Sequence, residues 1–445
     1  MKLPHVRPLL ELAIPMILST SAISIMQIID AIILSRHSSE AVAAIGPSGL
    51  AVILFQGLLF GTAGYAGTFV AHSHGRGDPS GVRASAWLGI YTAVASGLIA
   101  LAVAWPLAQL FFMAGHEPKV AQDECIYFGI CMAGSLFPVL SSALTGWLSG
   151  IGRPVIVTGV TFISLVVNAL CAWGLVLGEW GLPRMGIAGA ALATVGAQAV
   201  TVILCVVLFG MSGGLTDPLA RRINWGEYRR FLLVALPMGL RISGELAAWT
   251  LFLVVVGRLG TVELAASSIA FRINGTAFFP ALGLGQAAGV LVGHARGGGR
   301  DSDIPGIGWQ SLMVCELWMV TMALLFAVAS APLVSLFAGT GAESAGIVRT
   351  GSLLMKFVAF YCIFDAANVV IGSVLAAAGD TPWIARTFFA CSGLFVVALW
   401  LIDRTIPGLV AEWSLATFFV FATAVIWSIR FHAGVWRKLK PFVTR

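Results

Sequence analysis

Long apolar runs separated by short polar connections repeat along the whole chain. Because the hydrocarbon core of a bilayer needs about 20 residues per helix, these runs predict twelve transmembrane helices. Their expected ranges are 9–35, 42–71, 84–113, 121–148, 154–178, 186–210, 231–257, 264–293, 308–337, 346–378, 383–402 and 410–436. An outer-membrane barrel would instead show alternating segments of about ten residues. The pattern therefore predicts an all-α integral membrane protein.

The composition agrees with this prediction. Hydrophobic residues make up 58% of the 445 residues, charged residues make up 10%, and the mean hydropathy is +0.94. A soluble chain carries about 25% charged residues. The first apolar run follows Lys2 and Arg7 but is long and lacks a small-residue cleavage signal, so we expect it to be the first span.

The chain contains an internal repeat. Residues from about 13 to 77 reappear 222 positions later without a gap, and matches at Pro15 and Pro237 and at Gly61 and Gly283 are part of it. A tandem repeat in a membrane chain is typical of a transporter with its site between the halves. Six spans per half predict two lobes related by an axis along the membrane normal. We expect an N-terminal lobe over 1–210, a cytoplasmic linker over 211–230 and a C-terminal lobe over 231–445.

The distribution of basic residues predicts the orientation. With a cytoplasmic N-terminus, lysine and arginine fall mostly in the cytoplasmic connections, so both termini should face the cytoplasm. This topology accounts for the net charge of +6 without a nucleic-acid surface. The seven scattered cysteines suggest neither a disulfide framework nor a structural metal site.

Ionisable residues at bilayer depth are costly and mark candidate functional sites. Asp30 lies in the outer half of the first span, one turn from Gln27. In the seventh span, Arg241, Glu245 and Trp249 are four residues apart and share one helical face. The two charges either form part of a functional site or pair permanently for packing, and the sequence leaves both interpretations open.

The tenth span carries Tyr361, Asp365 and Asn368 as one polar stripe, which predicts a cation or proton site or, alternatively, an inter-helix hydrogen-bond ladder. Arg272 lies deep in the eighth span, whereas Glu316 and Lys356 are expected nearer span ends, where long side chains reach the interface.

Pro15 and Pro237 lie at equivalent places in the first helix of each half, and each permits a bend. Motifs for ATP binding or hydrolysis are absent, so the chain is not expected to be an enzyme.

Several segments resemble the multidrug and toxic compound extrusion (MATE) family of the wider flippase-exporter superfamily. They are the Asp30 region with EAVAAIG, GWLSGIGRP, VNALCAWGLVLG, MGIAGAALAT, LPMGLRISGELAAW and FDAANVVIGSVLAAAGDT. The resemblance covers essentially the whole chain. It implies a carboxylate at Asp30 beside the bend at Pro15, an asparagine at Asn168, and coupling carboxylates at Glu245 and Asp365. One branch has an aspartate one turn after that asparagine, where this chain has Ala172.

The resemblance implies an antiporter that exports drugs or other small organic compounds by alternating access, coupled to H⁺ or to Na⁺ bound at Glu245 and Asp365, with no cofactor. The expected substrate cavity includes Gln27, Arg241, Trp249, Arg272, Tyr361 and Asn368. Arg241 and Arg272 also suggest a zwitterionic or anionic substrate. A lipid-linked flippase and a non-transporting scaffold are the alternatives. We expect a monomer in the bacterial cytoplasmic membrane, with no nucleic-acid partner.

Overall fold

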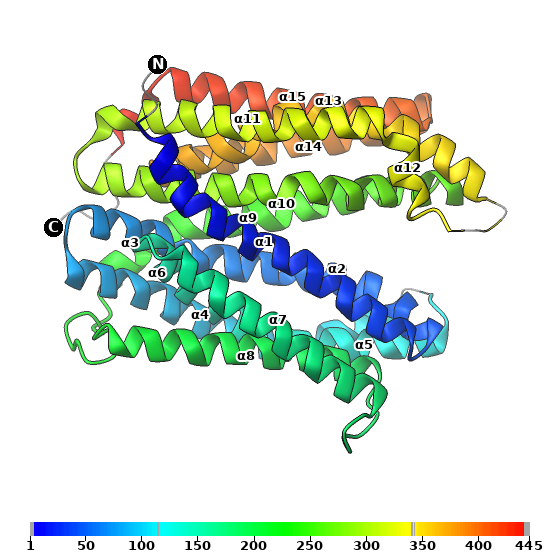
Figure 1. The fold of residues 1–445 in the computed structure, drawn as a ribbon, viewed down its shortest axis with the longest axis horizontal. Helices are drawn as coiled ribbons and strands as arrows, with labels where there is room; N and C mark the ends of the chain where they lie inside the picture. Colours follow the sequence, from blue (N-terminus) through cyan, green and yellow to red (C-terminus); the bar gives the residue numbers. More distant parts are fainter. Residues whose placement is uncertain (1–3, 114, 340, 342, 440–445) are drawn as a thin grey trace. The chain divides into compact units, whose positions relative to one another are not determined.

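The structure, a computed structural model, is built from long α-helices (Figure 1). It describes residues 4–113, 115–339, 341 and 343–439, and the side chains of Ser39 and Val42 are not described. The helices are α1 (Val6–Ser35), α2 (Ser39–Gly64), α3 (Ala66–Gly75), α4 (Pro79–Ala108), α5 (Pro118–Ala133), α6 (Leu136–Gly150), α7 (Pro154–Leu177), α8 (Ile187–Met211), α9 (Trp225–Val256), α10 (Thr261–Gly297), α11 (Ile304–Val328), α12 (Ser330–Ser335), α13 (Ser344–Ala377), α14 (Thr381–Thr405) and α15 (Leu409–His432). Short 3₁₀ turns η1 (Gln109–Met113), η2 (Asp301–Asp303) and η3 (Val435–Lys438) complete the described structure.

The described residues contain twelve apolar segments that can cross a membrane. Eleven are single spans by length and composition, and the twelfth is the pair α5 and α6, bent by 45° at its break. The prediction of twelve spans is therefore confirmed when this bent pair is taken as one span. The bend falls at Gly134 and Ser135, within the segment 121–148 that we expected to be continuous.

The chain's own contacts group it into two compact units whose boundaries lie inside helices. Among the described residues, one unit takes those up to Ile17 together with those from Gly244 to Leu439, and the other takes Leu18–Ser243. The boundaries therefore cut α1 two residues after Pro15 and α9 six residues after Pro237. The lobes 1–210 and 231–445 stay a prediction, since a division by sequence repeat is a different property from a division by contacts.

Two equivalent close approaches join helices that come from different halves of the sequence. In the unit of Leu18–Ser243, a Cβ added to Gly61 of α2 would lie 2.9 Å from the Cα of Gly239 in α9. In the other unit, a Cβ added to Gly283 of α10 would lie 2.7 Å from the backbone nitrogen of Ile17 in α1. The repeat offset of 222 relates the two contacts to each other, because it takes Gly61 to Gly283 and Ile17 to Gly239. Glycine thus lets the first helix of each sequence half pack against the second helix of the other half.

Each unit has its own packed interior. In the first, α13 contacts α10, α11 and α15 along its length. In the second, α7 packs on α8, and α4 contacts α3, α5 and α6. Small residues dominate several of these contacts, as expected where lipid supplies no hydrophobic drive between helices.

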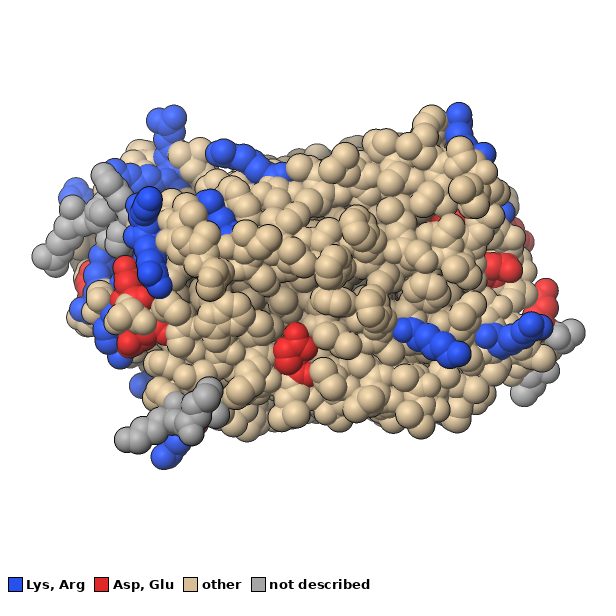
Figure 2. All heavy atoms as spheres, turned by 90° about the horizontal axis from the view of Figure 1, so that it is seen from above, with Lys and Arg blue, Asp and Glu red and all other residues tan. Residues whose placement is uncertain are grey.

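The outer surface is apolar over much of its area. Figure 2 shows one face on which lysine and arginine gather near the two ends, while the band between them is almost free of charge apart from one group of acidic atoms. Large exposed residues such as Leu98, Ile99 and Leu317 are more than half accessible. A soluble protein rarely exposes such a surface, whereas a bilayer covers it.

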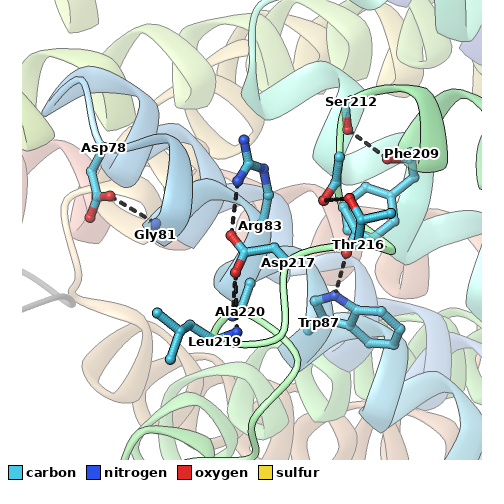
Figure 3. Close-up of polar contacts among 12 residues, drawn as sticks. Asp78, Gly81, Arg83, Trp87, Phe209, Ser212, Thr216, Asp217, Leu219 and Ala220 are labelled. Carbon is cyan, nitrogen blue, oxygen red and sulfur yellow. Dashed lines mark hydrogen bonds and ion pairs between the residues drawn. The ribbon is translucent and has the colours of Figure 1, made fainter.

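The connection between α8 and α9 is held against α4 (Figure 3). Arg83 Nη1 donates to Asp217 Oδ2 at 2.8 Å, and the Trp87 indole N–H donates to the Gly214 carbonyl at 3.0 Å. Asp217 Oδ1 accepts the backbone N–H groups of Leu219 and Ala220, both at 3.1 Å. The Arg221 guanidinium lies 5.5 Å from the ring centroid of Trp87. The predicted linker is thus an ordered segment fixed to one helix.

We expect Asp217→Asn to loosen this connection. The Ala220 N–H and then the Arg83 guanidinium hold the pKa of Asp217 below its usual range. A lowered pKa means that the stabilisation is complete above the usual aspartate pKa of about 3.9 and is lost only as the pH falls through the lower folded value. At pH 7, Asp217→Asn should raise the rate of tryptic cleavage after Arg221 and Arg222 about two- to fivefold.

The matched control is Asp403→Asn, which removes the 2.8 Å ion pair with Arg258 in the other unit and should leave that cleavage unchanged. Equal cleavage rates for Asp217→Asn and the unaltered protein at pH 7 would show that the ion pair does not hold the connection.

Candidate functional site

Asp30 is enclosed within the unit of Leu18–Ser243. Its residue is 7% exposed, and its Oδ1 atom receives no hydrogen bond from any described residue. Tyr127 and Cys131 of α5 lie within electrostatic range of its carboxyl group. A carboxylate in such a place is stable only with a proton or a cation.

Asn168 of α7 is a second enclosed polar residue of the same unit. It is fully buried, and its Nδ2 atom lies 3.5 Å from the Thr194 hydroxyl of α8. Thr194 also shares a hydrogen bond with the Tyr127 side chain. Tyr127 therefore links the surroundings of Asp30 to those of Asn168. The Oδ1 atom of Asn168 accepts no hydrogen bond from the described residues, which leaves an acceptor available to a ligand.

Ala172, one turn after Asn168, is fully buried in an apolar cluster with Ile33, Leu34 and Val176. The methyl group fills this position and supplies no ligand atom. A cation bound beside Asn168 would receive no carboxylate from this turn of α7.

Asp365 and Glu245 form the corresponding carboxylate group of the other unit. Glu245 of α9 lies within electrostatic range of Asp365 of α13. A charge on Glu245 disfavours a second charge on Asp365, and a proton or a cation at Asp365 relieves this repulsion. Binding of a cation by Glu245 and Asp365 stays a prediction.

The polar stripe of α13 surrounds Asp365. Asn368 is hydrogen-bonded to the Asp365 side chain and donates from Nδ2 to the Val420 carbonyl of α15 at 3.0 Å. Tyr361 is buried within electrostatic range of Asp365. The Cys362 thiol donates to Asn274 Oδ1 of α10 at 3.5 Å. Asn368 thus joins α13 to α15 and also contacts the carboxyl group of Asp365.

Trp249 belongs to an aromatic cluster within the same unit as Asp365. Its ring centroid lies 5.3 Å from that of Phe271 and 5.9 Å from that of Phe252. Phe395 and Phe419 are each at 6.4 Å. Four elements contribute, namely α9, α10, α14 and α15. The rings pack mainly edge to face against one another, and Phe252 and Phe395 are buried.

The remaining predicted residues are less enclosed. Gln27 and Arg272 are exposed, and Arg241 is half-buried. Pro15 and Pro237 lie inside the continuous helices α1 and α9. The assignments of all these residues to a substrate cavity or to helix bending stay predictions.

Sequence reasoning missed Tyr127 and Thr194. Tyr127 is one of only five tyrosines in the chain, and it lies in an apolar run, which is a weak signal for a polar contact. Thr194 ends the MGIAGAALAT segment without a charge to attract attention. Only the packing of α5 and α8 reveals that both side chains reach the surroundings of Asp30 and Asn168.

The chain matches one family model twice. The MatE model matches residues 15–173 and again residues 237–401, so the two matches begin 222 residues apart, at Pro15 and Pro237. The chain belongs to the MatE family. The repeat seen in the sequence is therefore the family's own repeat, and the protein is a multi-pass membrane transporter and not an enzyme.

The chain is also similar in sequence to curated proteins of comparable length. The chain is 29% identical over 444 residues to the "Probable multidrug resistance protein NorM" of Agrobacterium fabrum, covering 97% of this chain and 88% of the relative. It is 28% identical over 445 residues to the "Multidrug resistance protein NorM" of Burkholderia vietnamiensis, covering 95% and 92%.

Solved structures show the same fold. The outward-facing conformation of a multidrug resistance MATE family transporter of the MOP superfamily matches with a TM-score of 0.87 and 17% identity over 97% of both chains. A MOP superfamily transporter from Pyrococcus furiosus, described as having a binding pocket of reverse polarity, matches with a TM-score of 0.86 and 16% identity over 97% of both chains. The fold of this MatE protein is thus that of MATE transporters, as the sequence motifs predicted.

Proposed function

We propose that this MatE protein is a cation-coupled exporter of drugs and other small organic compounds, working by alternating access. The observation that carries the proposal is that Glu245 and Asp365, two half-buried carboxyl groups of one unit, lie within electrostatic range of each other. Binding of a proton or Na⁺ lowers the electrostatic free energy of such a pair, so we expect release only when the surroundings of the pair change. The names of the NorM relatives support the substrate class.

The coupling residues we propose are Glu245, Asp365, Asp30 and Asn168. Asp30 and Asn168 are buried, and Glu245 and Asp365 are half-buried. This enclosure supports the assignment, because an enclosed carboxyl group changes its cation occupancy when its access to water changes. A cation shifts a conformational equilibrium only through its different affinity for the two states. Cation release on one side of the membrane then has to accompany substrate binding.

The substrate cavity we propose includes residues of different character, namely Gln27, Arg241, Trp249, Arg272, Tyr361 and Asn368. The aromatic cluster around Trp249 supports a flat or cationic compound. Arg241 supports the second candidate, an anionic or zwitterionic metabolite, and the Pyrococcus transporter of reverse pocket polarity has the same fold. A non-transporting scaffold is not supported, since the family consists of transporters.

We further propose a bacterial cytoplasmic-membrane location with both termini in the cytoplasm, a monomer, and lobes over 1–210 and 231–445 joined by the segment 211–230. The lysine and arginine distribution supports the orientation. The repeat and the two family-model matches support the lobes.

Purified protein in liposomes provides the test. We expect efflux of an organic cation to accelerate about tenfold or more when a pH gradient or a sodium gradient is imposed, and to stay at the leak rate when both are absent. An anionic compound tested in parallel distinguishes the second candidate. Equal fluxes with and without either gradient, for both kinds of compound, would contradict ion coupling.

A further inference from the structure

Glu316 does not lie where the sequence suggested. We expected it near the end of a span over 308–337, but α11 ends at Val328 and a separate helix, α12, begins at Ser330. Glu316 is therefore the middle residue of α11. It lies about 18 Å from either helix end, far more than a glutamate side chain can reach. Snorkelling to the interface does not explain this residue, and the sequence-based expectation is wrong.

One face of α11 is made of exposed apolar side chains. Met313, Leu317, Val320 and Leu324 are 45%, 73%, 38% and 62% accessible, respectively. On the opposite face, Cys315 and Met319 are fully buried. Glu316 is half-buried and lies on the flank between the two faces. Its side chain is thus placed where the protein surface meets the acyl chains of the bilayer.

The Glu316 carboxyl group lacks the partners that a charged group needs. Its Oε2 atom is enclosed and receives no hydrogen bond from any described residue. No ion pair of Glu316 occurs among the described residues. A carboxyl group at this depth without a partner is costly when ionised, so it either carries a proton or meets a cation.

The depth restricts which cation can reach it. Inorganic ions and the amino groups of phospholipids stay in the aqueous or headgroup regions, well away from the middle of a span. An organic ammonium ion with an apolar body partitions into the bilayer and carries its charge inward along its hydrocarbon part. Such an amphiphile would place its alkyl chain on the exposed face of α11 and its ammonium group on Glu316.

This position also lies close to the proposed coupling site. Cys315, the residue next to Glu316, is within electrostatic range of both Glu316 and Asp365. The helix α11, which carries Glu316, packs against α13, which carries Asp365. A compound bound at Glu316 would therefore lie on the helix next to the one that carries Asp365.

We propose that Glu316 and the apolar face of α11 form a membrane-side binding site for amphiphilic organic cations. The choice of ligand class rests on the exporter function proposed above. Binding itself needs no gradient, so it can be measured even if ion coupling fails. A failure of the coupling proposal would appear as absent gradient-driven flux with binding intact.

The test uses the full-length protein in lipid nanodiscs and two probes, decyltrimethylammonium and tetramethylammonium, with partition into empty nanodiscs subtracted. We expect Glu316→Gln to weaken decyltrimethylammonium binding at least about tenfold and to leave tetramethylammonium binding unchanged. The matched control is Thr321→Val, because Thr321 is exposed on the same helix and its hydroxyl donates only within its own turn, to the Leu317 carbonyl at 2.7 Å. This variant should bind both probes like the unaltered protein.

Equal decyltrimethylammonium affinity in the unaltered protein and Glu316→Gln would overturn the proposal, as would no binding at all. If Glu316→Gln does not fold, the unaltered protein still decides the question. Dicyclohexylcarbodiimide adds to membrane-embedded carboxylic acids and leaves a stable acylurea that mass spectrometry locates. Decyltrimethylammonium should slow this addition at Glu316 at least about threefold, and an unchanged rate would count against the site.

Discussion

Replacing Asp365 with asparagine is expected to abolish gradient-driven export, lowering the initial rate roughly a hundredfold. Asparagine has nearly the shape of aspartate but can neither take up a proton nor hold a cation by charge. The 3.0 Å hydrogen bond from Asn368 to Val420 should persist, so α13 and α15 stay packed. The substitution also removes the carboxyl group that lies within electrostatic range of Glu245.

Transport into inverted vesicles, measured together with substrate binding in the absence of a gradient, tests this expectation. Asp365→Asn should lose transport and retain binding, since only the coupling step is removed. Glu245→Gln should behave in the same way. Asp403→Asn, which alters a carboxyl group of the same unit that pairs with Arg258 at 2.8 Å, should transport normally. Full transport by Asp365→Asn would remove this residue from the coupling mechanism.

Valine in place of Gly61 or Gly283 should destabilise the protein more than most substitutions in exposed parts of its helices. The added Cβ would lie 2.9 Å from the Gly239 backbone in one case and 2.7 Å from the Ile17 backbone in the other, so two helix backbones have to separate. Overpacking of this kind costs about 1–3 kcal/mol. For a unit of this size, each 1 kcal/mol lowers the thermal unfolding midpoint by about 2–4 °C.

Gly49 supplies the matched control for Gly61, because it lies in the same helix α2 and a Cβ there would meet nothing within 4 Å. Gly49→Val carries the same cost of a β-branched residue in a helix without the clash. Gly61 and Gly283 belong to different units, so the variant with valine at both positions should show the sum of the two shifts in the unfolding midpoint. A midpoint for Gly61→Val equal to that of Gly49→Val would refute the steric explanation.

Hydropathy was sufficient to predict the number of spans and the class of fold, because a bilayer imposes a minimum length on every apolar helix. It could not reveal the bend between α5 and α6 or the break between α11 and α12, since both lie inside unbroken apolar runs. Because the break between α11 and α12 was not predicted, Glu316 was expected near the end of its span instead of at the middle of α11. A helix boundary within an apolar segment depends on packing, which hydropathy does not measure.

The candidate site was predictable in part. Asp30, Glu245 and Asp365 are conspicuous because charges are rare in apolar runs. The proximity of Glu245 to Asp365 joins positions 120 residues apart, and no local pattern records it. Tyr127 and Thr194 are neutral, so only the tertiary structure identifies them as neighbours of the polar group around Asp30 and Asn168.

The unit boundaries inside α1 and α9 determine how the two units are tethered. The segment between α8 and α9 is bound to α4, and both it and the start of α9 belong to the same unit. Within the part of the chain that the structure describes, the units are therefore connected covalently through two stretches of helix, at Ile17–Leu18 and Ser243–Gly244. A helix resists bending far more than a loop does, so the stiffness of these two stretches, each preceded by a proline, would set how freely the units can move.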